Sequence, residues 1–337
     1  MPQSQIASMR NPGSLRASIN QSGSHHRLAV LAMVGATLLW SIAGVVTRHL
    51  HRNNGLDLVF WRSSFTAITV LVWLLCKQGA GSLWSELRGA TKLLWLSALF
   101  WAVMFTAFMV ALSLTTVAQT LVTDSMSPLV AAVLGWLILR HPLPVRTWGA
   151  IFLAMLGMGW MVWHNLYAAV NHRQLVGLLV AFAVPLAAAS NWVSLRRAGG
   201  VVSMQPALMI GAALSAVAVI GFATPFAVDG HDLGWLAFLG VFQLAVPGLL
   251  AIWAAQRLAP AETGLLGLLE VIFGTLWAWL GAGERPAVST LLGGFLILVA
   301  LVGNEVLGWR QARRQFRKAL LCSRDGAGAA FSSERVR

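Results

Sequence analysis

Long apolar runs alternate with short polar connections along almost the whole chain. Ten of these runs approach the roughly 20 residues that a helix needs to cross the hydrocarbon core of a bilayer. This pattern predicts an all-α integral membrane protein with ten transmembrane helices. The predicted spans are residues 28–50, 56–76, 93–114, 118–139, 145–165, 175–195, 204–224, 233–256, 261–282 and 287–309.

The fourth span differs from its neighbours because it carries a carboxylate, Asp124. At 100° per residue, Gln119, Thr123 and Asp124 share one arc of about 140° with Thr120 and Ser127. A charged group inside a bilayer costs roughly 2.5 to 3.5 kcal/mol and usually faces a bundle interior or a water-filled cavity. We therefore expect the polar side of this helix to face such a cavity.

The two halves of the chain form an internal repeat. A shift of 144 residues aligns residues 111–119 with residues 255–263 and carries Pro142 to Pro286. Each half then holds five spans, and because five is odd, the second half enters the membrane from the opposite side. Such inverted repeats place a binding site between the halves near the middle of the bilayer, and access to it alternates as one half rocks against the other.

The ninth span is the repeat counterpart of the fourth, and it also carries an acid, Glu270. Gly267 and Gly274 lie on the same side of this helix. Two interpretations of these glycines stay open. They could let α-helices of the membrane pack closely together, or they could leave room for a ligand beside the carboxylate. Asp124 and Glu270 are candidates for one of two roles: counter-ions of a substrate amine, or groups that carry a proton. The alternative is that they form a structural pair with Arg62.

Composition and charge narrow the class of protein. Of the 337 residues, 58% are hydrophobic and 10% are charged, whereas about a quarter are charged in soluble proteins. The net charge of +13 does not indicate nucleic-acid binding, because the basic residues lie between and after the apolar runs rather than on one soluble face.

The distribution of Lys and Arg predicts the orientation. Nineteen of them flank the spans on one side and four on the other. By the positive-inside rule, both termini are cytoplasmic, and a bacterial inner membrane is the expected location. We predict a disordered cytoplasmic tail at residues 1–27, five-helix repeats at residues 28–167 and 174–309, and a basic tail at residues 310–337 that contacts anionic lipid headgroups.

Four stretches carry a resemblance to a known family. They are LLWSIAGVVTRHL in the first span, FWRSSFTA in the second, ALSLTTVAQTLVTDSMSPLVAAVLGWLILR across the third and fourth, and LLEVIFGTLWAWLGAGERP in the ninth. With the five-plus-five repeat, they resemble the drug/metabolite transporter superfamily, specifically its ten-helix family with paired EamA domains. The resemblance covers about residues 28–309 and is specific for the fold rather than for a substrate.

The resemblance implies a secondary transporter, often an exporter of a small metabolite or drug, that works by alternating access. It also implies a central cavity lined mainly by the first, third, fourth, sixth, eighth and ninth spans. Mid-helix polar or amphipathic residues on these spans could instead only hydrogen-bond across helices. The predicted substrate-binding residues are Trp40, Ser41, Gln119, Thr123, Asp124, Asn191, Gln243 and Glu270.

The chain departs from the family pattern at one place. The family has a Gly-Glu or Arg-Glu pair after the fourth and ninth spans. Gly283-Glu284 matches the second pair, but the first reads Arg140-His141. Because His141 replaces an acid, an ion pair that gates the cytoplasmic side is in question for the first half.

Other polar residues have structural interpretations. For Arg62, about a turn inside the outer boundary of the second span, snorkelling to the interface or pairing with Asp57 is favoured over ligand contact. Pro247 lies in the middle of the eighth span and predicts a bend there. His49 and His51 form an H-x-H pair in an outer loop without a recognisable set of further ligands, so we predict no metal site.

The sequence contains neither a Walker A motif nor a nucleophile with a base at a recognisable spacing. We therefore predict no enzyme activity and no cofactor. The predicted partners are a small-molecule substrate and membrane lipids, with a homodimer as an option. Two alternatives to a metabolite carrier stay open: a flippase for lipid-linked substrates, and a membrane sensor or scaffold that does not transport.

Overall fold

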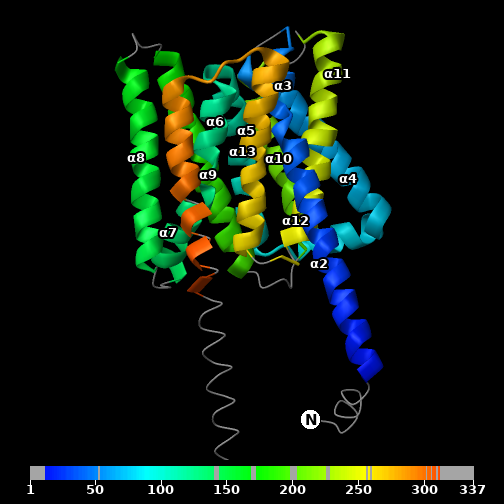
Figure 1. Cartoon of the computed structure of the whole chain (residues 1–337). Coiled ribbons are helices and arrows are strands. Elements are labelled where there is room, and N and C mark those ends of the chain that lie inside the picture. The colour runs from blue at the N-terminus through cyan, green and yellow to red at the C-terminus, as the bar shows by residue number, and fades with distance from the viewer. Residues whose placement is uncertain are drawn as a thin grey trace, which may run out of the picture.

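The computed structural model is a bundle of helices that stand side by side (Figure 1). It describes residues 12–51, 54–139, 144–167, 172–197, 203–224, 228–255, 257–258, 260–300, 302–304, 306–308 and 310–311. We call the end of the bundle where α2 enters the inner end, and the opposite end, where α3 ends and α11 begins, the outer end. In Figure 1 these are the lower and upper ends.

The elements are helical throughout the described residues, as the apolar periodicity predicted. In chain order they are α2 (Pro12–Ser41), α3 (Ala43–Arg48), α4 (Gly55–Arg88), α5 (Lys92–Leu114), α6 (Val117–Asp124), α7 (Ser127–Leu139), α8 (Val145–Tyr167), α9 (His172–Arg197), α10 (Gln205–Val219), α11 (Gly230–Phe238), the π-helix η2 (Leu239–Ala245), α12 (Val246–Ala255) and α13 (Pro260–Ala282). A last apolar helical segment covers Val288–Gly308.

Three of the ten spans are divided into pieces. The first consists of α2 and α3, the fourth of α6 and α7, and the eighth of α11, η2 and α12. By length and composition, six described stretches can each cross a membrane, and Gln205–Val219 and Leu269–Ala282 are shorter apolar helices. The divided spans matter for function because two of the breaks adjoin predicted substrate-binding residues, and the third contains one.

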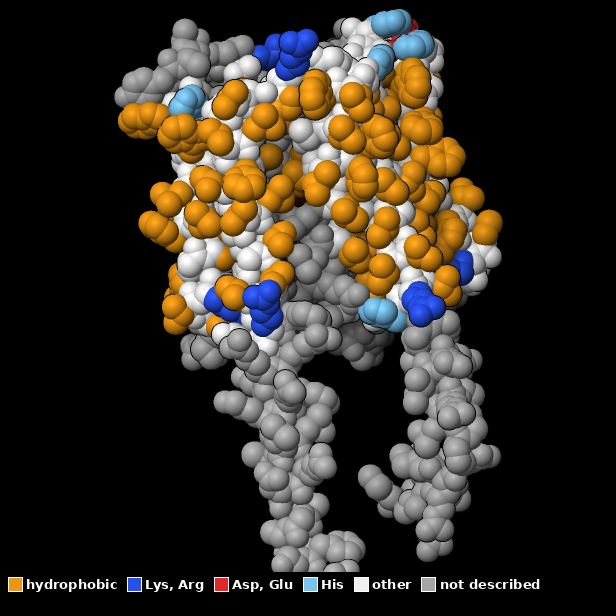
Figure 2. Space-filling view, in the orientation of Figure 1, with side chains coloured by type: hydrophobic (Ala, Val, Ile, Leu, Met, Phe, Trp, Pro, Cys, Tyr) orange, Lys and Arg blue, Asp and Glu red, His pale blue; other side chains and the backbone are white. Residues whose placement is uncertain are grey.

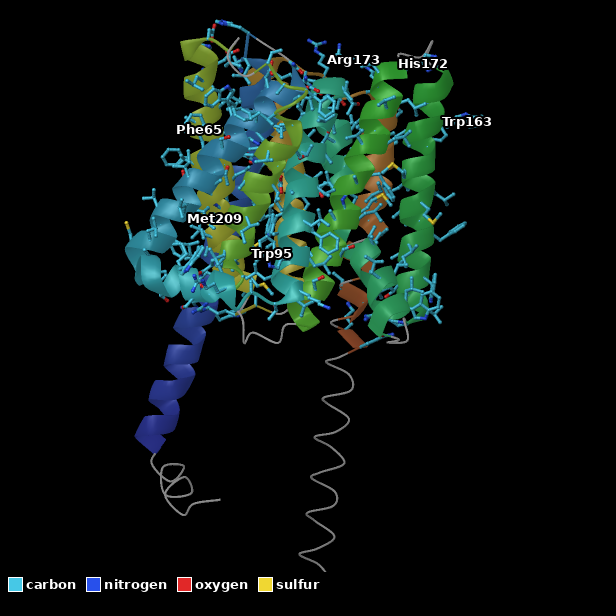
Figure 3. The ribbon with its side chains drawn as sticks, turned by 180° about the vertical axis from the view of Figure 1, so that it is seen from behind. Phe65, Trp95, Trp163, His172, Arg173 and Met209 are labelled. Carbon is cyan, nitrogen blue, oxygen red and sulfur yellow. The ribbon has the colours of Figure 1, made fainter. Side chains whose placement is uncertain are left out.

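The flank of the bundle has the character of a lipid-facing surface. Figure 2 shows a broad band of apolar side chains, with Lys and Arg near its two ends. Trp95 and Trp163 are 52% and 56% exposed, and Figure 3 shows them toward opposite ends of the bundle. Tryptophan is enriched at the two interfaces of a membrane, so this placement fits a bundle that spans one.

Contacts between the two halves of the chain build much of the interior. The α5 helix packs along α9, and α4 packs along α10. The α2 helix contacts both α12 and α13, and α6 contacts α9 and α13. A Cβ on Gly157 of α8 would lie 2.6 Å from the carbonyl oxygen of Gly293, so the fifth and tenth spans also approach closely. The protein therefore has one interior that both halves share.

One helix end differs from the sequence-based expectation, and the end of the second span agrees with it. The first helix begins at Pro12, so residues 12–27, expected as a disordered tail, are helical and extend from the inner end (Figure 1). Proline is tolerated at the first position of a helix because its missing N–H is not needed there. The α4 helix changes direction at Gly79, whose φ of 77° and ψ of 161° favour glycine. The second span thus ends near residue 78.

Candidate functional site

The fourth span breaks at Asp124. The α6 helix ends at this residue, Ser125 and Met126 form a turn, and α7 begins at Ser127. The Met126 N–H bonds to the Thr123 carbonyl at 3.2 Å, in the tighter pattern of a 3₁₀ turn. Discontinuous helices of this kind form binding sites in many transporters, because helix ends and free backbone groups point toward the cavity.

The chemistry of proline explains the break. Pro128 has no N–H, so it cannot bond to the carbonyl of Asp124, four residues earlier. The Ser127 hydroxyl donates instead, to the Asp124 carbonyl at 2.7 Å and to its carboxylate oxygen Oδ1 at 3.0 Å. The carboxylate of Asp124 is therefore held at the junction of α6 and α7, just before the positive end of the α7 dipole.

Glu270 of α13 comes close to Asp124 from the other half of the chain. The α13 helix packs against α6, the helix that ends at Asp124, so the two acids lie on adjacent helices. Both residues are half-buried rather than enclosed. The structure thus brings together the two acids that the sequence singled out.

The glycines of α13 divide between the two interpretations that the sequence left open. A Cβ on Gly267 would meet no atom within 4 Å among the described residues, so this side of Glu270 is open. A Cβ on Gly274 would overlap the Leu121 side chain and approach the Ser41 carbonyl to 3.3 Å. Gly274 therefore permits close packing of α13 against the first and fourth spans, whereas Gly267 leaves space.

The break in the first span lies beside the same helix. Ser41 is the last residue of α2, and its hydroxyl accepts a hydrogen bond of 3.1 Å from the Trp277 indole on α13. The Trp40 carbonyl accepts a hydrogen bond of 3.3 Å from the Gln243 amide. Trp40, Ser41 and Gln243 therefore form a contact between the first, eighth and ninth spans.

Gln243 also connects this contact to Arg62. Arg62 is 1% exposed, and it donates to Gln243 Oε1 at 3.2 Å and to the Phe105 carbonyl at 3.1 Å. The expected pairing of Arg62 with Asp57 is wrong for the described residues. Asp57 instead accepts from the backbone N–H of Thr224 at 2.5 Å, at the outer end. The bonds to Gln243 and Thr224 join the two halves of the chain, and the bond to Phe105 joins two spans of the first half.

The eighth span is a π-helix where it meets Arg62. The segment η2 covers Leu239–Ala245 and ends two residues before Pro247. The Gly240 carbonyl accepts a hydrogen bond of 2.9 Å from the Thr66 hydroxyl of α4, and a Cβ on Gly240 would lie 2.7 Å from the Arg62 carbonyl. A π-helix, a feature that is frequent at functional sites, therefore lies just before Pro247, and the bend predicted at Pro247 stays a prediction.

Three other predicted site residues are buried and hydrogen-bonded inside the protein. Gln119 accepts from the Thr115 hydroxyl, and the Thr123 hydroxyl donates to the Gln119 carbonyl at 2.7 Å. Asn191 of α9 accepts from Ser97 of α5 at 2.6 Å. Among the described residues, no hydrogen bond joins the Asn191–Ser97 pair to Asp124 or Glu270. These contacts stabilise the bundle and leave the role of the three residues in binding a prediction.

An ion pair joins the outer ends of the two halves. Arg48, at the end of α3, contacts Glu284 Oε2 at 3.1 Å and donates to the Thr115 carbonyl at 2.8 Å. Glu284 Oε1 accepts from the Val117 N–H at 2.8 Å. Gly283 turns the chain at the end of α13 with a φ of 64°, which glycine accommodates. Gly283 and Glu284, which match the family pattern, thus connect the two halves at the outer end of the bundle.

A pocket of about 360 Å³ lies next to this ion pair. Arg173, from the start of α9, donates to the Ser113 carbonyl at 3.1 Å at its edge. Figure 3 shows Arg173 and His172 at the outer end, far from Trp95. The pocket is separate from the Asp124–Glu270 site. It is lined by Arg48, Ser113, Leu114, Thr115, Thr116, Arg173, Gln174 and Glu284. Arg140 and His141 lie outside the described residues.

A cluster at the outer end was missed by the sequence analysis. His51 lies beside Asp229, His231 and Asp232, whose ligating atoms are all within 4.8 Å of one another. The Asp229 carboxylate accepts from the His51 ring at 3.0 Å and thereby raises the pKa of His51. The Asp232 N–H, and after it the His51 ring, lower the pKa of Asp229. Asp229, His231 and Asp232 lie within four residues of one another, but His51 is 178 positions from Asp229, so sequence spacing does not reveal that it joins them.

Comparison with known proteins identifies the family. The EamA-like transporter family matches residues 27–163 and 175–304. Two curated relatives, each named "Pseudopaline exporter CntI", come from Pseudomonas aeruginosa strains UCBPP-PA14 and PAO1. Each is 23% identical over 276 residues, which cover 81% of this chain and 94% of the relative.

A solved crystal structure shares the fold, with a TM-score of 0.57 at 18% sequence identity. The alignment covers 85% of this chain and 98% of that chain. The paired family matches are consistent with the inverted repeats inferred from the sequence and confirm the predicted ten-helix architecture. The chain therefore belongs to the EamA-like transporter family of the drug/metabolite transporter superfamily and is a multi-pass membrane transporter.

Proposed function

We propose that the transporter exports a small polar or amphipathic metabolite that carries an amine, by alternating access between the two halves. The observation that carries this proposal is the pair of half-buried carboxylates, Asp124 and Glu270, beside the open side of Gly267. Two like charges in a site of low polarity are unfavourable unless a cation or a proton lies between them. A substrate ammonium group or a coupling proton supplies that charge.

Access to this site would alternate through the two ends of the bundle. The Arg48–Glu284 ion pair and the Asp57–Thr224 bond hold the outer ends together. An outward-open state requires both contacts to separate. The breaks in the first and fourth spans and the π-helix of the eighth supply positions where the backbone can bend.

The distribution of charge and the names of the relatives support a proposal for the direction of transport and for the membrane. The excess of Lys and Arg at one end of the spans supports a cytoplasmic inner end and a bacterial inner membrane as the location. The two curated relatives are named as exporters. Outward movement of the substrate is accordingly the direction that we propose.

Metabolite profiling of the medium tests this function. Cells that overproduce the protein should accumulate at least one compound outside, and cells that produce Asp124→Asn or Glu270→Gln to the same level should not. Glu86→Gln is a matched control, because Glu86 bonds to Gln78 near the inner end of α4 at 2.9 Å. Unchanged export by both interior variants at every external pH tested would contradict the proposed role of the two acids.

A further inference from the structure

The cluster of His51, Asp229, His231 and Asp232 draws on two distant parts of the chain. His51 follows α3, at the end of the first span, whereas the other three residues surround the start of α11 in the eighth. The side-chain contact between His51 and Asp229 bridges 178 positions in the sequence. Figure 2 shows histidine side chains gathered at this outer end.

The donor atoms converge on one small volume. His51 Nδ1 lies 3.0 Å from Asp229 Oδ2 and 4.0 Å from Asp232 Oδ1. His231 Nδ1 lies 3.2 Å from the same Asp232 oxygen. In a tetrahedral zinc site with bonds near 2.1 Å, neighbouring ligand atoms are about 3.4 Å apart. The spacing of the four groups brackets this value, so small side-chain movements would suffice to form the site.

The surrounding contacts orient the ligands. Asp232 is 1% exposed, and its Oδ1 also accepts from the backbone N–H of His51 at 3.0 Å. Asp229 caps α11 by accepting from the Asp232 N–H at 2.8 Å. The His51 and His231 rings stack with their centroids 4.6 Å apart and an angle of 18° between them. Metal ligands are usually held by such additional hydrogen bonds and packing.

The identity of the donors selects the class of cation. Ca²⁺ and Mg²⁺ prefer oxygen ligands alone, whereas two imidazole nitrogens with two carboxylates suit Zn²⁺ and similar transition metals. A metal bound through His231 Nδ1 would shift the ring proton to Nε2. The Trp235 indole, which now donates to Nε2 at 3.2 Å, would then turn away. Trp235 is 39% exposed, so it has room to move.

We propose that these four residues form a binding site for Zn²⁺ or a similar divalent transition metal at the outer end. The bound ion would connect the loop after the first span to the start of the eighth. Because the two segments belong to different halves, the metal would hold the outer ends of the halves together. This inference concerns binding, and it does not depend on the substrate or on the direction of transport.

Metal titration of the purified full-length protein tests the site. Untagged protein in detergent, first stripped with a chelator, should take up one equivalent of Zn²⁺ in competition with a chromogenic zinc indicator. His51→Gln/His231→Gln should weaken this binding at least tenfold. His49→Gln is the matched control, because His49 is exposed in the same region and its ring bonds to the Val45 carbonyl at 2.8 Å.

A second variant keeps the test informative if the double variant folds poorly. Asp229→Asn retains an acceptor for the cap of α11 but removes the ligand charge. This variant should weaken Zn²⁺ binding. In a separate measurement, Co²⁺ bound to the wild-type protein should show the strong visible absorption of a tetrahedral ion. Equal Zn²⁺ affinity in the wild type, the double variant and Asp229→Asn would overturn the proposal, and so would an equal loss in His49→Gln.

Discussion

The fourth and ninth spans occupy corresponding places in the two halves, yet they hold their acids in different ways. The residue four positions after Asp124 is Pro128, which leaves the Asp124 carbonyl without its helical partner and breaks the span. The residue four positions after Glu270 is Gly274, and α13 continues without interruption from Pro260 to Ala282. An acid lies near the middle of each span, but only one of the two helices is divided.

The difference indicates that the inverted repeat preserves the position of a charged group more closely than the local backbone. In the fourth span, the carboxylate lies at a junction that can bend. In the ninth, it lies on a straight helix that packs through Gly274 against the first and fourth spans. We infer that the fourth span is the more mobile partner and the ninth the more rigid one.

The largest expected effect comes from copying the proline into the ninth span. Gly274→Pro removes an N–H from the interior of α13 and places a ring against Leu121. It should destabilise the protein by about 3 kcal/mol or more and reduce the amount of folded protein in size-exclusion chromatography. Gly274→Ala should cost about 1 to 3 kcal/mol at most. If the proline variant is as stable as the wild type, α13 is not the rigid partner.

Filling the open side of the ninth span should block transport without loss of stability. Gly267→Leu adds a side chain where a Cβ meets no described atom within 4 Å, so we expect export to fall at least tenfold and the melting temperature to stay or rise. Gly159→Leu is the matched control, because Gly159 is an exposed glycine on α8 that also meets no described atom. Normal export by Gly267→Leu would show that this space is not used by the substrate.

Making the fourth span more like the ninth should have a smaller effect. Pro128→Ala restores an N–H that can bond to the Asp124 carbonyl, which is worth about 1 kcal/mol. The melting temperature should rise, and export should fall about threefold because the junction bends less easily. Both can be measured on the purified protein and in the profiling experiment. A higher melting temperature with unchanged export would separate the helix break from the transport cycle.

The smallest expected effect is a pH dependence of the melting temperature. It arises from the outer end of the bundle and does not involve the two interior acids. Because the pKa of His51 is raised and that of Asp229 is lowered, their pair stabilises the fold between the two values. This contribution is lost as the pH rises through the raised pKa of His51, above 6.5. The melting temperature of Asp229→Asn should therefore differ from wild type at pH 6 more than at pH 8.5. An equal difference at both would contradict the pairing.

The sequence predicts the spans because lipid selects for runs of apolar residues that can be read locally. The two acids and the repeat can also be found in the sequence. The partner of Arg62 could not be predicted, since Gln243 lies 181 positions away and is brought close by α4 packing on the π-helix. The His51 cluster was missed for the same reason, because His51 meets Asp229, His231 and Asp232 only when the first and eighth spans pack.

The contacts between the halves have a consequence during synthesis. Since α2, α4, α5 and α6 all pack against helices from the second half, the nascent first half has no complete set of partners when it leaves the ribosome. Glu270 follows Asp124 by 146 positions, so at about 5 to 20 residues per second it is translated roughly 7 to 29 seconds later. Over that interval, Asp124 must reside in the bilayer without Glu270, so the insertion machinery or neighbouring lipids have to shield it.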